Sequence, residues 1–213
     1  MQTFHQLLAN TLVVATKNNF VWFGLTYWAY LATKSVIATG IVGGTFLVAA
    51  MLSSLWFGTL VDHYRKKAVM IGSGIATLTF FGLGLGLFLS LPSMAFGSVS
   101  SPAFWAFVVI LLLGVVSGNI YGIALPTLVT LLVPEKTRDK ANGLLGMGMG
   151  ISFAITSVGS GLVLSAWGMS GILGISITLT ILALIHLSTI HVGEKRIIHT
   201  HPPNSRYADI KKT

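Results

Sequence analysis

Cysteine is missing from this 213-residue chain, and charged side chains are scarce. Without cysteine the protein can form no disulfide and no thiolate metal site. Only 8% of the residues are charged, and five of them are acidic, whereas a soluble domain carries roughly 25% charged residues. So few charges cannot cover a surface that faces water. The surroundings of most of the chain are therefore predicted to be the lipid bilayer.

Long apolar runs take the place of the missing charges. The hydrocarbon core of a bilayer is about 30 Å thick, and a helix needs about 20 apolar residues to cross it. The sequence predicts spans at residues 7–31, 36–57, 68–91, 104–133, 142–167 and 171–190. The alternating segments of roughly ten residues that build membrane β-barrels are not found. The predicted fold is all-α, a polytopic membrane protein whose residues 1–191 form a bundle of six transmembrane helices.

The basic residues predict how this bundle lies in the membrane. Lys and Arg gather in cytoplasmic loops of membrane proteins. With a cytoplasmic amino terminus, eleven of the thirteen fall inside, Lys34 lies outside and Lys17 lies within the membrane. Both termini are therefore predicted to be cytoplasmic, in a cell membrane, with residues 192–213 as a basic cytoplasmic linker. Topology explains the pI near 10, and we expect no nucleic-acid partner.

The segment from Gly58 to Lys67 joins the second and third predicted spans. It resembles the signature loop of the major facilitator superfamily, Gly-x-Leu-Ala-Asp-Arg-x-Gly-Arg-Arg. Gly58, Leu60 and Asp62 match this pattern, and Lys66 and Lys67 replace its paired arginines. The sequence departs from it at Val61, His63 and Arg65. From the local chemistry alone, Asp62 is expected to cap the following helix and to pair with a nearby cation.

Further resemblance favours the drug- and siderophore-exporter branch of that superfamily. The segment from Val133 to Asn142 is similar to that branch's Val-Pro-x-x-x-Arg-x-x-Ala-Asn motif, while Ser160 replaces the proline of its antiporter pattern. The resemblance implies the amino-terminal half of a twelve-helix transporter, built as two three-helix inverted repeats. It also implies a conformational latch formed by Gly58, Leu60, Asp62, Arg65, Lys66 and Lys67.

Polar residues interrupt the first predicted span at Lys17, Asn18 and Asn19. A charge at the bilayer centre costs about 2.5–3.5 kcal/mol on insertion scales, so it normally faces a wet cavity or a partner. Matching polar positions line the substrate cavity in related exporters, according to the resemblance. The predicted cavity set is Lys17, Asn18, Asn19, Trp22, Tyr27 and Asn119. A structural contact of Lys17 with polar groups such as Asn119 or Ser117, or a lysine at a helix end, is the alternative. For Trp22 the alternative is anchoring at the membrane interface.

Glycines recur at helical spacing on several spans. Small residues four apart let membrane helices approach closely. The predicted helix-packing glycines are Gly114, Gly118, Gly122, Gly146, Gly150, Gly159 and Gly161. Gly40 and Gly44 form a similar pair on the second span.

Enzyme and metal chemistry receive little support. Gly168-Met169-Ser170-Gly171 matches the nucleophile pattern of intramembrane serine proteases, but His186 lies sixteen residues further along the same span, roughly 24 Å away in a helix. We interpret this segment as a tight extracellular turn. His199 and His201 are too few ligands for a metal site, and no channel filter sequence is found. We expect no enzyme activity, metal or cofactor.

The sequence thus predicts a secondary active transporter that exports small amphipathic compounds by alternating access. Its expected partners are the lipid bilayer, a small-molecule substrate, and a carboxy-terminal six-helix half or a second copy of this chain. A half-size membrane protein that self-associates or serves as a non-transporting assembly partner is the alternative.

Overall fold

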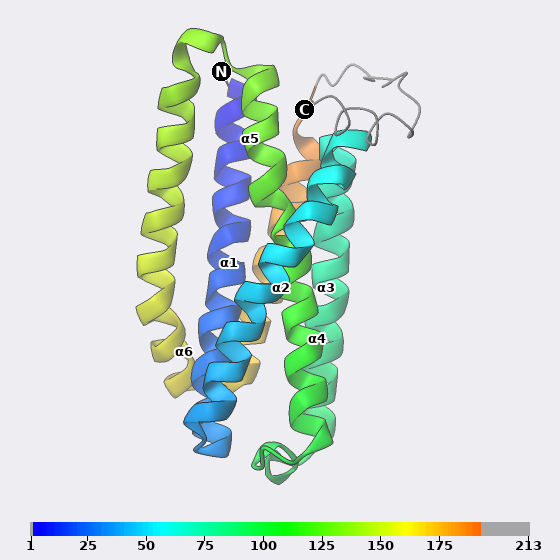
Figure 1. Cartoon of the computed structure of the whole chain (residues 1–213), viewed down its shortest axis with the longest axis vertical. Helices are drawn as coiled ribbons and strands as arrows, with labels where there is room; N and C mark the ends of the chain where they lie inside the picture. Colours follow the sequence, from blue (N-terminus) through cyan, green and yellow to red (C-terminus); the bar gives the residue numbers. More distant parts are fainter. Residues whose placement is uncertain (1, 193–213) are drawn as a thin grey trace, which may run out of the picture.

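A computed structural model describes residues 2–192, and all regular structure in that range is helical. The helices are α1 Gln2–Thr33, α2 Val36–His63, α3 Lys66–Ser90, α4 Pro102–Gly118, α5 Ile120–Leu132 and α6 Arg138–Thr189, with the 3₁₀ helices η1 Ser93–Phe96 and η2 Glu135–Thr137. They lie side by side in an elongated bundle (Figure 1). The all-α prediction is confirmed.

Helices α4 and α5 follow one another along a single rod, which corresponds to the predicted span 104–133. Asn119 separates them but keeps right-handed helical angles, with φ −66° and ψ −16°. Its amide donates to the Val116 carbonyl, three residues back, which tightens the turn without reversing the chain. Pro126 lies inside α5 and has no amide hydrogen to donate to the preceding turn. The rod therefore continues from Pro102 to Leu132 despite the break.

Helix α6 folds back on itself at Gly168, where φ is 65° and ψ is −168° (Figure 1). This backbone conformation is essentially restricted to glycine, because a Cβ would clash with the neighbouring peptide groups. The reversal falls inside the turn that the sequence predicts between residues 167 and 171. The two arms of α6 correspond to the predicted spans 142–167 and 171–190.

Substitution of Gly168 by Ala is expected to destabilise the protein by about 1–3 kcal/mol, the cost of holding a side chain in this conformation. Gly174→Ala is the matched control, because Gly174 is helical and a Cβ there would meet no atom within 4 Å. Ala is a better helix former than Gly, so the control is expected to be neutral or slightly stabilising. Thermal unfolding in detergent measures both. Equal melting temperatures for the two variants would contradict a strained reversal.

The predicted cytoplasmic segments share one end of the bundle. Figure 1 places the start of α1, the α2–α3 junction, the α5–α6 connection and the end of α6 together, and η1 with the Gly168 reversal at the opposite end. The basic segments around Arg65 and Arg138 therefore lie at the same end as the start of α1. This arrangement agrees with the charge asymmetry that the sequence predicts.

Four helical stretches in residues 2–192 are long and apolar enough to cross a membrane. They are Val36–His63, Lys66–Ser90, Pro102–Leu132 and Glu135–Thr189, and the last contains the reversal. Helix α1 has 32 residues and sufficient length, but its polar residues keep it out of this group. The chain is therefore a multi-pass membrane protein, with α1 as its least apolar long helix.

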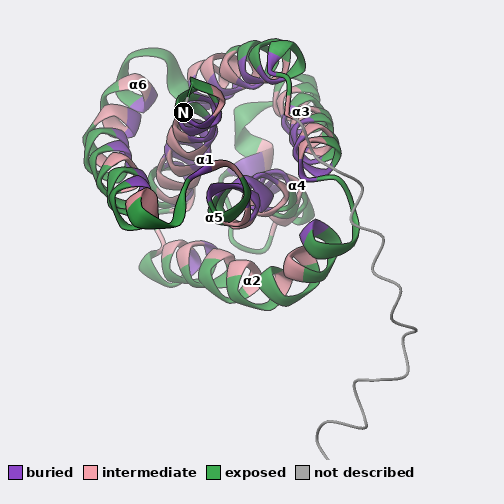
Figure 2. Cartoon of the chain, turned by 90° about the horizontal axis from the view of Figure 1, so that it is seen from above, coloured by how far each residue is buried: buried purple, intermediate pink, exposed green. Residues whose placement is uncertain are grey.

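Burial is uneven around the bundle. The most apolar window of α2 is only 11% buried, compared with 56% for that of the α4–α5 rod. Seen from above, α5 lies at the centre and α2 at the rim (Figure 2). Large apolar side chains such as Leu55, Trp56 and Ile155 point outward with more than half of their surface exposed. An apolar rim of this kind suits lipid or another membrane helix better than water.

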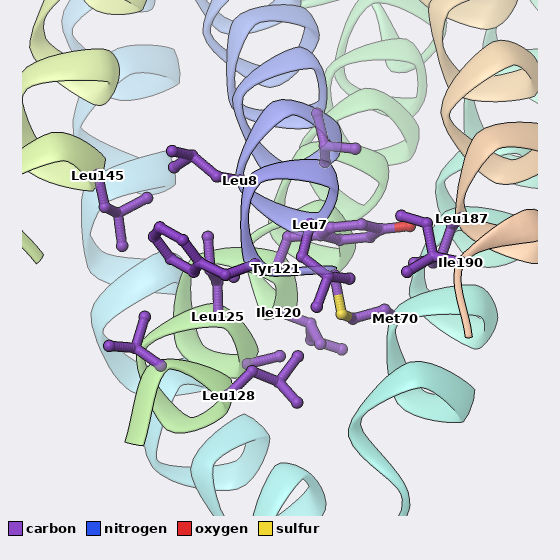
Figure 3. Packing of buried hydrophobic residues seen from close by; sticks show 14 of the residues in the cluster. Leu7, Leu8, Met70, Ile120, Tyr121, Leu125, Leu128, Leu145, Leu187 and Ile190 are labelled. Atoms are coloured by element: carbon purple, nitrogen blue, oxygen red, sulfur yellow. The ribbon is translucent and has the colours of Figure 1, made fainter. Parts of the chain in front are cut away.

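Two clusters of buried residues form the core. The cluster near the chain ends gathers around Tyr121, which lies among Leu7, Met70 and Leu187 (Figure 3). The other surrounds Trp28, whose ring stacks on Phe104 with centroids 5.7 Å apart. Helix α1 and the second arm of α6 contribute to both clusters. Helix α5 contributes to the first cluster and α4 to the second. The core therefore holds α1 against the later part of the chain.

Candidate functional site

The signature loop begins inside α2 rather than after it. Helix α2 continues six residues past the predicted span end, Phe57, so Asp62 occupies its last turn. Arg65 is the N-cap of α3 and makes no side-chain cap hydrogen bond. The expectation that Asp62 caps α3 is therefore wrong. A carboxylate in the last turn of a helix faces the negative end of the helix dipole, so this position disfavours Asp62 locally.

The expected pairing of Asp62 with a nearby cation is also not found. Asp62 is exposed, and among residues 2–192 its carboxylate makes no ion pair. Lys67 instead donates to the carbonyl oxygens of Ser188, at 3.0 Å, and Ile190, at 2.6 Å. These are carbonyls at the end of α6, where a cation complements the helix dipole. The loop is thus tied to the end of the bundle's last helix.

Arg138 plays a similar part at the start of α6. Its Nη2 donates to the Thr130 carbonyl at 2.8 Å, and its Nε donates to the Val133 carbonyl at 3.2 Å. Both acceptors lie at the carboxyl end of α5, where carbonyls have no helical partner. The arginine of the Val133–Asn142 motif therefore caps the carboxyl end of the preceding helix, α5.

Lys17 is buried inside the bundle, with 1% of its surface exposed. Its Nζ lies 5.1 Å from the centroid of the Phe81 ring on α3 and has no hydrogen-bond partner among the described residues. The neighbouring Asn18 donates from Nδ2 to the Val115 carbonyl at 3.4 Å, and its Oδ1 has no partner in the same range. Lys17 and Asn18 therefore face α3 and α4 and line no open cavity in this conformation.

Trp22 and Tyr27 lie on another side of α1. The Trp22 ring packs near Phe46 of α2 and Phe153 of α6, with centroid distances of 5.2 and 6.3 Å. The Tyr27 hydroxyl donates to the Ser157 carbonyl at 3.0 Å. Trp22 is half-buried and Tyr27 is exposed, and both face α2 or the first arm of α6. Trp22 and Tyr27 are thus separated from Lys17 by the helix itself.

The remaining predicted cavity residues, Asn19 and Asn119, are half-buried. Asn119 lies at the α4–α5 junction, and none of the described hydrogen bonds joins its side chain to Lys17. The structure therefore splits the six predicted cavity residues between an interior pair, an aromatic pair and two separate asparagines. Their role in substrate binding stays a prediction.

Sequence reasoning missed the polar contacts near the start of α1. Asn10 is buried and donates from Nδ2 to the Ala183 carbonyl at 2.7 Å, and the same nitrogen lies 3.2 Å from His186 Nδ1. Thr16 shares a hydrogen bond of 2.8 Å with Ser152. The spacing could have predicted these contacts, because Asn10 and Lys17 are seven residues apart and so lie on one helix face.

The predicted packing glycines also fall into two groups. A Cβ at Gly114 would lie 2.6 Å from the Phe81 ring, and one at Gly118 would overlap the Asn18 carboxamide. One at Gly161 would meet Tyr27 at an ordinary 3.7 Å. At Gly122, Gly146, Gly150 and Gly159, and at Gly40 and Gly44, nothing in the described chain lies within 4 Å. Close packing within the bundle therefore involves Gly114 and Gly118, while the other ridges face outward.

The residues considered for enzyme and metal chemistry are not brought together. Ser170 donates to the Trp167 carbonyl at 3.2 Å, within the Gly168 turn, whereas His186 contacts Asn10. His199 and His201 lie outside the described residues. Within residues 2–192 no three His, Asp or Glu side chains cluster as a metal site.

Comparison with known proteins gives one clear match. The family model of the major facilitator superfamily matches residues 7–206, nearly the whole chain. Comparisons with curated proteins and with solved structures returned no match. The matched range includes the loop from Gly58 to Lys67 and the motif from Val133 to Asn142. The chain therefore belongs to the major facilitator superfamily, whose members are membrane transporters.

Proposed function

We propose that this chain is the amino-terminal six-helix half of a secondary transporter that exports small amphipathic compounds by alternating access. The four rods identified by length and apolarity, with α6 counted as two arms and α1 added, amount to six crossings. An even number of crossings agrees with the start of α1 and the end of α6, which lie at the same end of the bundle (Figure 1). A cytoplasmic position for that end follows from its basic residues.

The position of Asp62 carries the proposal. It lies in the last turn of α2, is exposed, and has no cation partner within residues 2–192. Its own helix dipole disfavours a carboxylate there, so a favourable partner has to come from elsewhere. A second six-helix bundle that docks on the same side would supply a cation in one conformation and withdraw it in the other. Such a contact can latch one state of a rocking transporter.

The apolar rim is an argument for a second bundle and for an amphipathic substrate. Helix α2 and the first arm of α6 are largely exposed (Figure 2), and their exposed residues include many large apolar side chains. Between them lie the half-buried rings of Trp22, Phe23 and Phe46, with Phe153 close by. Aromatic faces bind apolar and cationic groups without requiring one particular shape. We assign this aromatic group to the substrate path in preference to the interior pair Lys17 and Asn18.

The test uses Asp62→Asn in the complete transporter, in the membrane of its source cell. Loss of an interfacial charge pair costs about 2–5 kcal/mol, so the transport rate is expected to fall at least tenfold. Retention of fluorescent amphipathic compounds by cells measures transport, and immunoblotting checks that protein remains in the membrane. Asp139→Asn is the control, because Asp139 is exposed in the other basic loop at the same end. Unchanged transport in the Asp62 variant would remove the latch.

A further inference from the structure

A groove opens between α2 and α3 beside the signature loop, with a volume of about 480 Å³. Its lining includes Phe57, Leu60 and Tyr64 from α2, Gly72 and Ala76 from α3, and Ser117 from α4. Gly72 leaves the α3 wall open, since a Cβ there would meet no atom within 4 Å. The groove therefore has large side chains on one wall and small ones on the other.

The polar groups along the groove already have hydrogen-bond partners within the protein. Ser73 donates from Oγ to the Ser117 carbonyl at 2.6 Å, and the Ser117 hydroxyl donates to the Leu113 carbonyl at 2.7 Å. These hydroxyl groups already have partners, and the other lining side chains are apolar or small apart from the Tyr64 hydroxyl at the open end. An apolar chain is the ligand that such walls favour.

The length of the groove indicates what kind of apolar chain fits. On α3 it runs from Ala68 to Ala76, about 12 Å at 1.5 Å per residue. One leaflet of the hydrocarbon core is about 15 Å deep, half of the full core thickness. A partner transmembrane helix would contact the wall across the whole membrane, whereas this groove ends near the midplane. Its depth therefore suits an acyl chain of one leaflet.

Charge at the open end indicates the headgroup. Tyr64 is 62% exposed at this end, and the exposed Arg65 follows it directly. The segment holds three cations, Arg65, Lys66 and Lys67, and one carboxylate, Asp62. Lys66 is buried and Lys67 donates to the end of α6, so Arg65 is the exposed cation at this end. The first turn of α3 holds no acidic residue that would repel an anion. Arginine can bind a phosphate with two parallel hydrogen bonds.

We propose that this groove binds an anionic phospholipid of the cytoplasmic leaflet, with an acyl chain between α2 and α3 and its phosphate at Arg65. The inference rests on the cytoplasmic position of the loop and not on transport, so it can fail or hold independently of the proposed export activity. Lipid in the groove would hold α2, the helix that carries Asp62, at a fixed distance from α3.

Native mass spectrometry of the detergent-extracted protein tests the proposal. Phosphatidylglycerol and phosphatidylcholine with identical acyl chains are titrated separately, and the retained lipids are counted. Arg65→Gln removes the phosphate contact, with Lys136→Gln as a control that removes one charge from the other loop. Gly72→Leu fills the groove, with Gly82→Leu as a control, because Gly82 is also exposed on α3 and open but lies outside the groove.

The expected result is selective retention of phosphatidylglycerol. Arg65→Gln should weaken its binding about fivefold, the effect of one cation at a membrane surface, and Gly72→Leu should abolish retention. Both controls should bind like the unaltered protein. Equal retention of the two lipids, or no effect of Arg65→Gln, would overturn the headgroup assignment. Unchanged binding in Gly72→Leu, or no retained lipid at all, would overturn the groove itself.

Discussion

Gly118→Leu is expected to lower the free energy of unfolding by about 3 kcal/mol, near the upper end of the usual cost of overpacking a core. A Cβ at residue 118 would overlap the carboxamide of Asn18, with its Cγ only 2.8 Å away. Asn18 is 5% exposed and donates to the Val115 carbonyl on the same helix as Gly118. Either the carboxamide rotates and loses that hydrogen bond of 3.4 Å inside the core, or α1 and α4 separate.

Gly122→Leu, about one turn further along the same rod, is the matched control. A Cβ at Gly122 would meet nothing within 4 Å, so this change should leave stability the same or raise it slightly through better helix propensity. Thermal unfolding in detergent measures both variants. Adding Asn18→Ala to Gly118→Leu should restore part of the loss, because it removes the overlapping group. If Gly118→Leu and Gly122→Leu melt together, the close α1–α4 approach is wrong.

Lys17→Met is expected to stabilise the protein, by about 1 kcal/mol. A lysine at the bilayer centre costs about 2.5–3.5 kcal/mol on insertion scales, while its interaction with an aromatic ring returns about 2 kcal/mol when it is desolvated. The ring is that of Phe81, 5.1 Å from Nζ, and no hydrogen-bond acceptor offsets the rest within residues 2–192. Methionine has a similar length and buries without that penalty.

The same variant tests whether Lys17 has a function. A residue kept at a cost in stability is expected at a functional site, so transport by the complete protein should fall even though the melting temperature rises. Lys136→Met, in an exposed loop, should change neither quantity. A lower melting temperature for Lys17→Met would mean that the amine has a favourable partner. A higher one with full transport would remove Lys17 from the functional residues.

The sequence predicted the positions of the long apolar helices well because apolar length is a strong signal. The predicted span 68–91 is α3 at Lys66–Ser90, and the predicted span 104–133 is the α4–α5 rod. The end of α2 was placed too early, at residue 57, because its last turns are polar. A helix that leaves the hydrocarbon core can continue in water, so a change to polar residues does not mark the end of the helix.

The faces of α1 were harder to predict. In a helix surrounded by other apolar helices, lipid-facing and core-facing positions have similar composition, so the sequence does not separate them. Lys17 was placed in the cavity as a charge inside a span and Trp22 as an aromatic ring suited to a lipophilic substrate, yet they lie on different sides of α1. Only the contacts with Phe81 and Phe46 distinguish the two sides.

Helix α1 is made before α2 to α6, and its polar contacts are with later helices. Its polar side chains bond to groups far along the chain: Asn18 to Val115, Thr16 to Ser152, and Asn10 to Ala183. During synthesis these partners reach the membrane only after most of the protein has been inserted. Helix α2 is strongly apolar and mostly unburied, so it can insert into lipid without contacts to later helices. The polar contacts of α1 can therefore be completed only after α6 has been made.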